Sequence, residues 1–433
     1  MDNFVVGLIG FIGLLGIIIL GVPIAFAAGF VGIIGLFAIG GVNVTFHFLG
    51  SSPYSEIANY AYTTLPLYIL LGEFAYHGGY AEGAYRTVRQ WLSGLPGGLA
   101  IATILGGAAF GAVSGASVAS AAVLGKICIP EMRKLGYDQS LAAGTVASCA
   151  NLSSMIPPSG LMIVYSIFTE QSLSKLFISG ILPGVLIALL FSAMIYIRVL
   201  LNPKLAPPMD EPVSWQSRFA SLRYAWQVLL IAAVILGGIY TGTFTVTEAG
   251  GAGALTAFLL MGRKISWNNL KVILLSALRT TIMVLFIIVG IMFFTYFLTL
   301  SRVPIVVSEF LTGLPISPLL ILSSIIIFYL FLGMFFDAIS MIALTIPVLF
   351  PTVVALGYNP IWFGVICVLM CEVGLLTPPV GINCFVVAGV APDIPLNQIF
   401  KGVIPFIFMD LIAVVILIAF PEIALFLPSL MGP

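Results

Sequence analysis

Long apolar runs, separated by glycine, proline and charged residues, follow one another along the whole chain. Runs such as 231–240 and 319–332 lack the regular polar and apolar alternation of membrane β-barrel strands. Many of the runs reach the roughly 18–20 residues that a helix needs to cross a bilayer. The pattern predicts spanning or half-spanning segments at 4–20, 22–41, 55–77, 98–127, 139–169, 175–201, 224–241, 244–262, 272–300, 317–357, 360–390 and 398–430.

The composition supports the same fold class, an all-α polytopic membrane protein with the lipid bilayer as its main solvent. Of the 433 residues, 61% are hydrophobic and 7% are charged, with a mean hydropathy of +1.20. Sixteen basic residues balance sixteen acidic ones, so no basic surface points to nucleic acid. The five cysteines lack the spacing of a disulfide framework or a metal site. The first residues carry no basic stretch, so we expect no cleaved signal peptide, and the first segment should remain a membrane helix.

Short motifs of the first half return in the second half at a nearly constant spacing. WLSGLP at 91–96 returns as FLTGLP at 310–315, PPSG at 157–160 as PPVG at 378–381, and GILP at 180–183 as GVIP at 402–405. The corresponding offsets are 219, 221 and 222 residues. Several ordered matches with so little drift indicate a duplication.

The duplication predicts two repeats, 1–201 and 224–433, joined by a polar cytoplasmic connection at 202–223. Hairpins are expected at 98–127 and 317–357, and broken helices at 139–169 and 360–390. Two basic residues, Arg86 and Arg89, precede WLSGLP in the first half. The segment before FLTGLP in the second half carries one basic residue, Arg302, together with the acidic Glu309. Basic residues collect on the cytoplasmic side. The two copies should therefore be inverted, as in many secondary transporters, with both termini in the periplasm.

Each half contains a run of small or hydroxylated residues and a proline pair within apolar sequence. The runs are GAVSGASVAS at 111–120 and GMFFDAIS at 333–340, and the proline pairs lie at 157–158 and 378–379. A proline pair removes two amide donors and disfavours helix just before it. Unwound backbone at membrane depth must be buried in protein or line a polar cavity. Its free carbonyls suit an alkali cation, whereas close helix packing is the alternative use of the small residues.

These motifs resemble those of a known family, and the resemblance extends over essentially the whole chain. SGAS at 114–117, IPPS at 156–159, TEA at 247–249 and LTPPVGIN at 376–383 together resemble the large membrane (M) subunit of tripartite ATP-independent periplasmic (TRAP) transporters. The resemblance implies a multi-pass protein of the bacterial inner membrane that takes up a small organic anion, a carboxylate or a sulfonate, by an elevator mechanism. It also implies a sodium gradient, a small four-helix membrane (Q) subunit and a periplasmic substrate-binding (P) protein.

The same resemblance assigns candidate site residues, largely through backbone carbonyls. Ala116 departs from the usual Ser-Gly-Ser-Ser tip, because it keeps the carbonyl but loses a hydroxyl. Polar side chains near the two breaks, together with half-helix N-termini, could contact the anion. The assigned residues are Ser114, Ala116, Ser117, Ser153, Ile156 and Pro158 for one sodium ion; Gly333, Asp337, Gly374, Thr377 and Pro379 for a second; and Ser159, Ser340 and Asn383 for the substrate.

The remaining polar residues in apolar sequence need separate explanations, because intramembrane carboxylates are costly. Glu248 should complement the amide groups of a helix that starts near Thr245. Glu372, one turn before the second proline pair, is expected to support that break. The sequence gives no task to Glu73 or Asp410, and it places His47 and His77 at the membrane interface.

Other function classes fit the sequence less well. We expect no enzyme: Ser114 has no nearby base for hydrolysis, and Asp337 and Asp410 lack the paired motifs of an aspartyl protease. A channel would show a filter or rings of side chains instead of paired broken helices. The runner-up is a single-component sodium/dicarboxylate symporter that works without a binding protein. The sequence leaves the anion and the sodium stoichiometry open.

Overall fold

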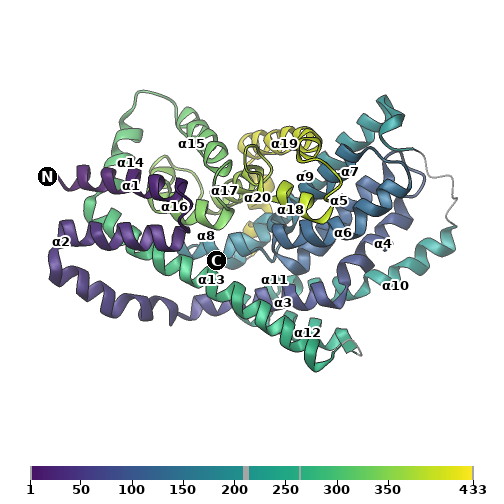
Figure 1. Ribbon diagram of the computed structural model, residues 1–433, viewed down its shortest axis with the longest axis horizontal. Coiled ribbons are helices and arrows are strands. Elements are labelled where there is room, and N and C mark those ends of the chain that lie inside the picture. The colour runs from purple at the N-terminus through teal and green to yellow at the C-terminus, as the bar shows by residue number, and fades with distance from the viewer. Residues whose placement is uncertain (1, 208–213, 263–264, 432–433) are drawn as a thin grey trace.

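The computed structural model is built of helices and describes residues 2–207, 214–262 and 265–431. Helices account for 84% of it, and none of the described residues forms a β-strand (Figure 1). The expected all-α class is confirmed. In the described part of the chain, six helical stretches are long and apolar enough to cross a membrane: Ile24–Ser55, Leu173–Leu201, Trp215–Tyr240, Trp267–Ser301, Ala338–Ala355 and Leu396–Ala419. The protein is thus a multi-pass membrane protein.

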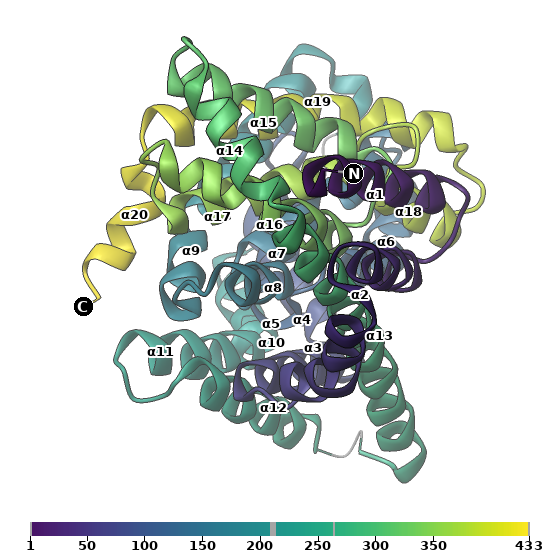
Figure 2. The same cartoon turned by 90° about the vertical axis from the view of Figure 1, so that its left-hand side faces the viewer.

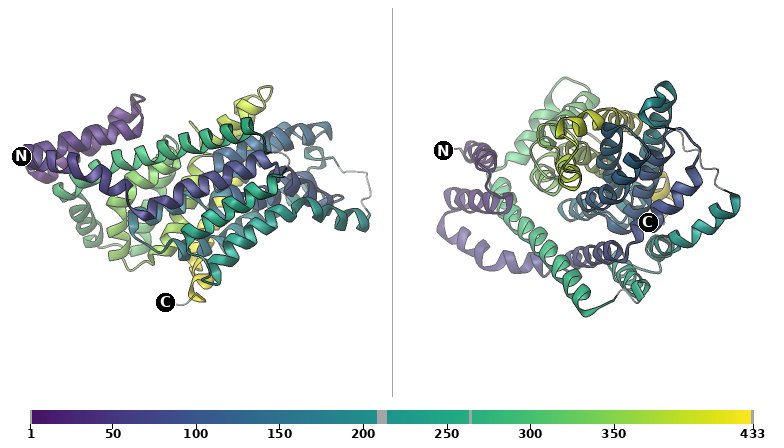
Figure 3. Two further views of the ribbon diagram at one scale, coloured as in Figure 1. Left: turned by 90° about the horizontal axis from the view of Figure 1, so that it is seen from below. Right: turned by 45° about the vertical axis from the view of Figure 1, so that its right-hand side comes forward.

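The first half begins with an arm and continues into a core. The arm contains α1 (Asn3–Ile19) and α2 (Ile24–Ile57), which lie at one end of the molecule in both views of Figure 3. Gly41 has φ 71° and ψ −173° inside α2, so the helix is interrupted where the sequence predicts that the second segment ends. The next elements are η1 (Tyr60–Thr63), α3 (Thr64–Gly78), α4 (Tyr80–Leu92), α5 (Gly98–Ser114), α6 (Ser117–Lys134), α7 (Gln139–Met155), α8 (Gly160–Thr169), α9 (Leu173–Leu201) and η2 (Pro203–Leu205).

The second half starts earlier than the sequence suggested. Helix α10 (Trp215–Ala232) begins inside the predicted connection 202–223, of which residues 208–213 lie outside the described part. The Arg218 guanidinium lies 4.8 Å from the centre of the Trp215 ring, so these polar positions belong to an amphipathic helix end and not to a loop. The elements that follow are η3 (Ala233–Gly237), α11 (Gly238–Tyr240), α12 (Val246–Met261), α13 (Trp267–Ser301), α14 (Val303–Gly313), α15 (Pro318–Gly333), α16 (Ala338–Ala355), α17 (Pro360–Gly374), α18 (Ile382–Val390), α19 (Leu396–Ala419) and α20 (Glu422–Ser429).

The order of elements in the core recurs between the halves. Helices α5 to α9 contain 17, 18, 17, 10 and 29 residues, and α15 to α19 contain 16, 18, 15, 9 and 24. Each predicted hairpin consists of two helices joined by a short turn, and each predicted broken helix consists of two helices. Segment 398–430 differs from its prediction, because α19 ends before Pro421 and α20 is a separate helix. The opposite orientation of the copies stays a prediction.

Helix α2 of the arm packs closely against α13, because glycine leaves room for the opposing backbone. A Cβ atom on Gly290 would lie 2.1 Å from the Ala25 carbonyl oxygen, and one on Gly32 would lie 2.5 Å from the Phe293 carbonyl carbon. Small residues at helix contacts serve this purpose in membranes, where neighbouring lipid provides no hydrophobic drive for association.

The core encloses the two broken segments. Every residue of α7 from Leu141 to Met155 is buried, and so is every residue of α17 from Ile361 to Gly374. Figure 2 shows α7, α8 and α16 in the middle of the view with the other helices around them. Of the prolines that sequence analysis singled out, Pro157 and Pro158 are buried, whereas Pro378 and Pro379 are exposed, and none of the four lies within a helix.

Candidate cation and anion site

The first hairpin turn touches the first proline break through backbone atoms. Gly115, with φ +65°, separates α5 from α6, and its carbonyl oxygen accepts a hydrogen bond from the Gly160 amide at 3.2 Å. A Cβ atom on Gly115 would lie 2.5 Å from the Pro158 carbonyl oxygen. Only glycine combines this left-handed backbone with so close an approach. The structure thus brings together the two segments that sequence analysis assigned to one sodium ion.

The side chains around this contact are small and polar. The Ser114 and Ser120 hydroxyl oxygens lie 3.1 Å apart across the turn. Ser153 is fully buried, and its hydroxyl lacks a hydrogen-bond partner within the described ranges. Ala116 is exposed and extended at the start of α6. The contact between Gly111 and Ser153, where an added Cβ would meet the Ser153 Cα at 2.5 Å, keeps α5 and α7 close at this point.

The first break also starts a new helix. Helices α7 and α8 are bent by 43° relative to each other across residues 156–159. Ser159 is the N-cap of α8, and its hydroxyl accepts from the Met162 amide at 3.3 Å. The predicted substrate contact Ser159 therefore caps α8, and the dipole at this helix N-terminus favours an anion nearby. The Pro157–Pro158 and Pro378–Pro379 peptide bonds are both cis.

The second hairpin turn meets the second break by an even closer contact. A Cβ atom on Gly333, the last residue of α15, would lie 2.4 Å from the Cα atom of Gly374, the last residue of α17. Thr377 is buried and donates its hydroxyl to the Val373 carbonyl at 2.7 Å. Pro379 is exposed beyond this turn. Gly333, Gly374 and Thr377 thus converge, as their assignment to one ion requires.

Asp337 and Ser340 are bonded to each other at the start of α16. Asp337 is the N-cap, and its carboxylate accepts from the Ser340 amide at 3.1 Å and from the Ser340 hydroxyl. The Ser340 hydroxyl is therefore already used in the turn. Asn383 differs: it is fully buried in the first turn of α18, and its side-chain oxygen and nitrogen both lack partners among the residues described. Of the three predicted substrate contacts, Asn383 has the side chain that is free to bind.

The donors present around both breaks are oxygen atoms of carbonyl, hydroxyl and amide groups. The described residues include no group of three or more His, Cys, Asp or Glu side chains that could hold a metal ion. Hard oxygen donors favour alkali and alkaline-earth cations over zinc or copper. The residues present fit a sodium ion that has lost part of its water.

A comparison with models of protein families gives one match that covers most of the chain. The family model described as "Tripartite ATP-independent periplasmic transporter, DctM component" matches residues 11–423. The chain belongs to this family.

Named relatives of this TRAP permease share most of its length. The C4-dicarboxylate TRAP transporter large permease protein DctM of Pseudomonas aeruginosa is 37% identical over 377 residues, which cover 86% of this chain and 87% of the relative. The isethionate TRAP transporter permease protein DctMQ of Oleidesulfovibrio alaskensis is 31% identical, and the match covers 94% of this chain and 64% of the relative. The sialic acid TRAP transporter large permease protein SiaM of Vibrio cholerae is 28% identical, and the match covers 96% of this chain and 97% of the relative. These names point to a transport role and not to an enzyme.

The fold of the permease is also found in a solved structure. The Alcanivorax borkumensis YdaH transporter is similar with a TM-score of 0.63 and 14% identity, over 90% of this chain and 91% of that chain. At this identity the likeness shows the fold alone.

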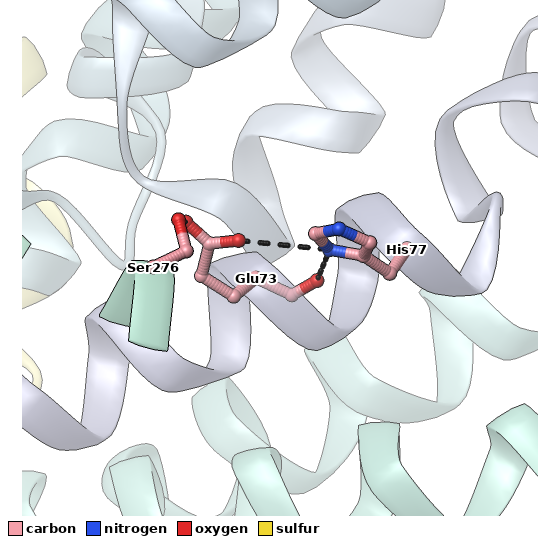
Figure 4. Close-up of polar contacts among 3 residues, drawn as sticks. All are labelled: Glu73, His77 and Ser276. Carbon is pink, nitrogen blue, oxygen red and sulfur yellow. Dashed lines mark hydrogen bonds and ion pairs between the residues drawn. The ribbon is translucent and has the colours of Figure 1, made fainter. Parts of the chain in front are cut away.

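The carboxylates of the permease outside the two turns have distinct surroundings. Thr245 and Glu248 form a reciprocal capping box at the start of α12, which confirms the structural role expected for Glu248. Glu73 of α3 accepts from the Ser276 hydroxyl of α13 at 2.6 Å and lies 3.6 Å from the His77 ring nitrogen (Figure 4). The cluster thus links α3 to α13.

Glu372 has neighbours in the first half of the chain, and its expected support of the second break stays a prediction. Its side chain is fully buried, and neither carboxyl oxygen makes a hydrogen bond within the part of the permease that is described. Its neighbours include the side chains of Ser117 and Ser154, which lie in the first half. Sequence reasoning considered the helix of Glu372 alone and therefore named only the second break. Because α17 packs against α7, the carboxyl also has serines of the first half beside it.

Sequence reasoning missed two neighbours of the site. A Cβ atom on Gly72 of α3 would lie 2.8 Å from the Ser114 carbonyl oxygen, so α3 packs directly on the first turn. Asn151 of α7 donates to Asp410 of α19 at 3.1 Å. A polar residue inside the buried α7 was the signal for Asn151, whereas Gly72 carried no local signal.

Proposed function

We propose that this TRAP permease carries out sodium-coupled uptake of a small organic anion across the bacterial inner membrane. The named relatives transport C4-dicarboxylate, isethionate and sialic acid, which are carboxylates or a sulfonate. The family implies a periplasmic substrate-binding protein and a small membrane subunit, and the fused DctMQ relative fits this organisation. The periplasmic protein delivers the anion, and the small Q subunit completes the membrane part.

The observation that supports sodium coupling is the pair of backbone contacts at the two breaks. At the first break the turn residue Gly115 meets the non-helical Pro158, where an added Cβ atom would lie 2.5 Å from the carbonyl oxygen. At the second, the helix ends Gly333 and Gly374 meet, and an added Cβ atom on either would lie 2.4 Å from the other's Cα atom. Carbonyls that leave a helix in a buried place need a partner. One sodium ion binds at Ser114, Ala116, Ser117, Ser153, Ile156 and Pro158, and a second at Gly333, Asp337, Gly374, Thr377 and Pro379.

The anion binds between these two ions. The side-chain amide of Asn383 donates to its carboxylate or sulfonate, and the N-terminus of α8 at Ser159 supplies a favourable helix dipole. Ser340 contributes by holding Asp337 in the second turn. Two sodium ions on either side offset the charge of the anion, so that a buried site binds all three together better than any one alone.

Transport follows an elevator mechanism in which the core, α5 to α8 with α15 to α18, moves against the arm. The two halves are inverted repeats and exchange conformations, which exposes the site first to the periplasm and then to the cytoplasm. The alternative function is a single-component sodium/dicarboxylate symporter that works without a binding protein.

Uptake by proteoliposomes that contain the permease and its small subunit tests the proposal. Labelled succinate, isethionate and sialic acid are each offered with and without the cognate binding protein, under an inward sodium gradient or equal sodium. We expect uptake of one anion only with both the gradient and the binding protein. Uptake that ignores the gradient would contradict sodium coupling, and gradient-driven uptake without the binding protein would support the single-component symporter.

A further inference from the structure

Asp410 lies inside an apolar helix and is fully buried. It belongs to α19, a 24-residue helix, and has 0% of its surface exposed. The described residues form three ion pairs, and none of them includes Asp410. The titratable side chain that faces it, Glu372 of α17, is acidic as well. An ionised Asp410 would therefore be a buried charge without a countercharge, which is costly in a membrane interior.

Asn151 of α7 is the hydrogen-bond partner of Asp410. The Asn151 Nδ2 atom donates to Asp410 Oδ2 at 3.1 Å. The second oxygen of each group, Asn151 Oδ1 and Asp410 Oδ1, is buried and has no partner among the residues described. Both of these atoms are acceptors if Asp410 is ionised. With Asp410 ionised, Asn151 Oδ1 and Asp410 Oδ1 would therefore both be buried acceptors with no donor to bond to in the described part of the chain.

Helices α7 and α19 pack closely about two turns away from this pair. A Cβ atom on Gly402 of α19 would lie 2.0 Å from the Ser140 carbonyl oxygen of α7, and one on Gly144 would lie 2.4 Å from Gly402. Helices in such contact cannot separate without losing their packing. A hydrogen atom supplied by the pair itself would satisfy both oxygens.

We propose that Asp410 is a proton-binding site, and that its proton is donated from Oδ1 to Asn151 Oδ1. The acid and the amide then form a cyclic pair with two hydrogen bonds, in which each group donates once and accepts once. One proton satisfies both unpartnered oxygens and removes the buried charge. The pair fastens α7, which carries Ser153 at the first break, to α19 of the second half.

With the proton bound, the contact between α7 and α19 carries no net charge. The inference concerns the protonation of the resting protein and does not depend on the proposed substrate.

Infrared spectroscopy of the purified full-length chain in lipid nanodiscs tests the proton directly. In a Glu372→Gln background, which removes the other fully buried carboxyl among the described residues, we expect at neutral pH a protonated carboxyl band that Asp410→Asn removes. Asn151→Ala should shift the frequency of this band, because the acid loses its acceptor. A spectrum in this background from which Asp410→Asn removes no protonated band would overturn the proposal.

Thermal unfolding with sodium chloride as the probe, against choline chloride at equal ionic strength, gives a second readout. An asparagine at 410 can form the same cyclic pair, so Asp410→Asn should keep the unfolding midpoint within about 2 °C and retain the sodium response. Asp410→Leu leaves the Asn151 amide unpaired and should lower the midpoint by at least about 3 °C. Loss of the sodium response in a folded Asp410→Asn variant would show that an ionised Asp410 is needed, and it would refute the neutral pair.

Discussion

Gly374→Ala tests whether the contact between the second turn and the second break binds sodium. The new Cβ atom would lie 2.4 Å from Gly333 Cα and 3.0 Å from the Gly333 carbonyl carbon. Both are backbone atoms, so no side chain can rotate away. Ordinary carbon contacts require about 3.5–4.0 Å, and α15 and α17 must therefore move apart by roughly 1 Å.

The cost follows from this overlap. Overpacking of a tight contact costs about 1–3 kcal/mol. If sodium binds across the contact, the ion must draw the two backbones together against this strain. Since each 1.4 kcal/mol is a factor of ten, the sodium dissociation constant should rise by roughly 5- to 150-fold.

The assay is the thermal unfolding midpoint of the full chain measured against sodium chloride, with choline chloride holding the ionic strength constant. A ligand that binds only the folded state raises the midpoint with its concentration. The matched control is Gly389→Ala in α18, where a Cβ atom would meet nothing within 4 Å. This control should keep the wild-type sodium response. Equal sodium responses in the two variants would refute the placement of a sodium ion at Gly333 and Gly374.

Three further predictions address a ligand, a cap and a surface ion pair. Thr377→Ala should weaken sodium binding about 10-fold, with Thr377→Ser as the control, and a sodium titration that matches wild type would count against this ligand. Thr245→Ala removes half of the capping box and should destabilise the fold by about 1 kcal/mol while the sodium response stays unchanged; a changed sodium response would give the cap a role in binding. The hydrogen bond from Arg133 holds the pKa of Asp393, in the loop before α19, below its ordinary 3.8. The pair should therefore stabilise the protein above that pH and lose its effect as the pH falls through the lowered pKa. When the unfolding midpoints of wild type and Asp393→Asn are titrated with pH, the two curves should converge in acid. A constant difference between the two curves would refute the pairing.

The two turns explain why the ends of α5, α7, α15 and α17 carry glycine and serine. Each turn must bring backbone to backbone, and any larger residue would fill the space between a hairpin and its break. Gly115 and Gly374 are the clearest cases, since an added Cβ atom at either position overlaps opposing main-chain atoms. The same closeness makes both places sensitive to a single methyl group.

The amino-acid sequence by itself determined the helical class, the positions of the breaks and the recurrence between the halves. These features are local: apolar runs decide where helices can exist, and proline pairs such as Pro157–Pro158 decide where they cannot continue. The family could be identified from the same motifs. The capping role of Glu248 was also predictable, because a cap depends on residues three positions apart.

Only the tertiary structure decided which breaks and side chains meet. Nothing local to Glu372 indicates that it faces Ser117 and Ser154 of the other half, and nothing local to Asp410 indicates Asn151, 259 residues away. These partners are chosen by the packing of α7 against α17 and α19. Such packing depends on the shapes of whole helices, and a chain read one residue at a time does not contain those distances.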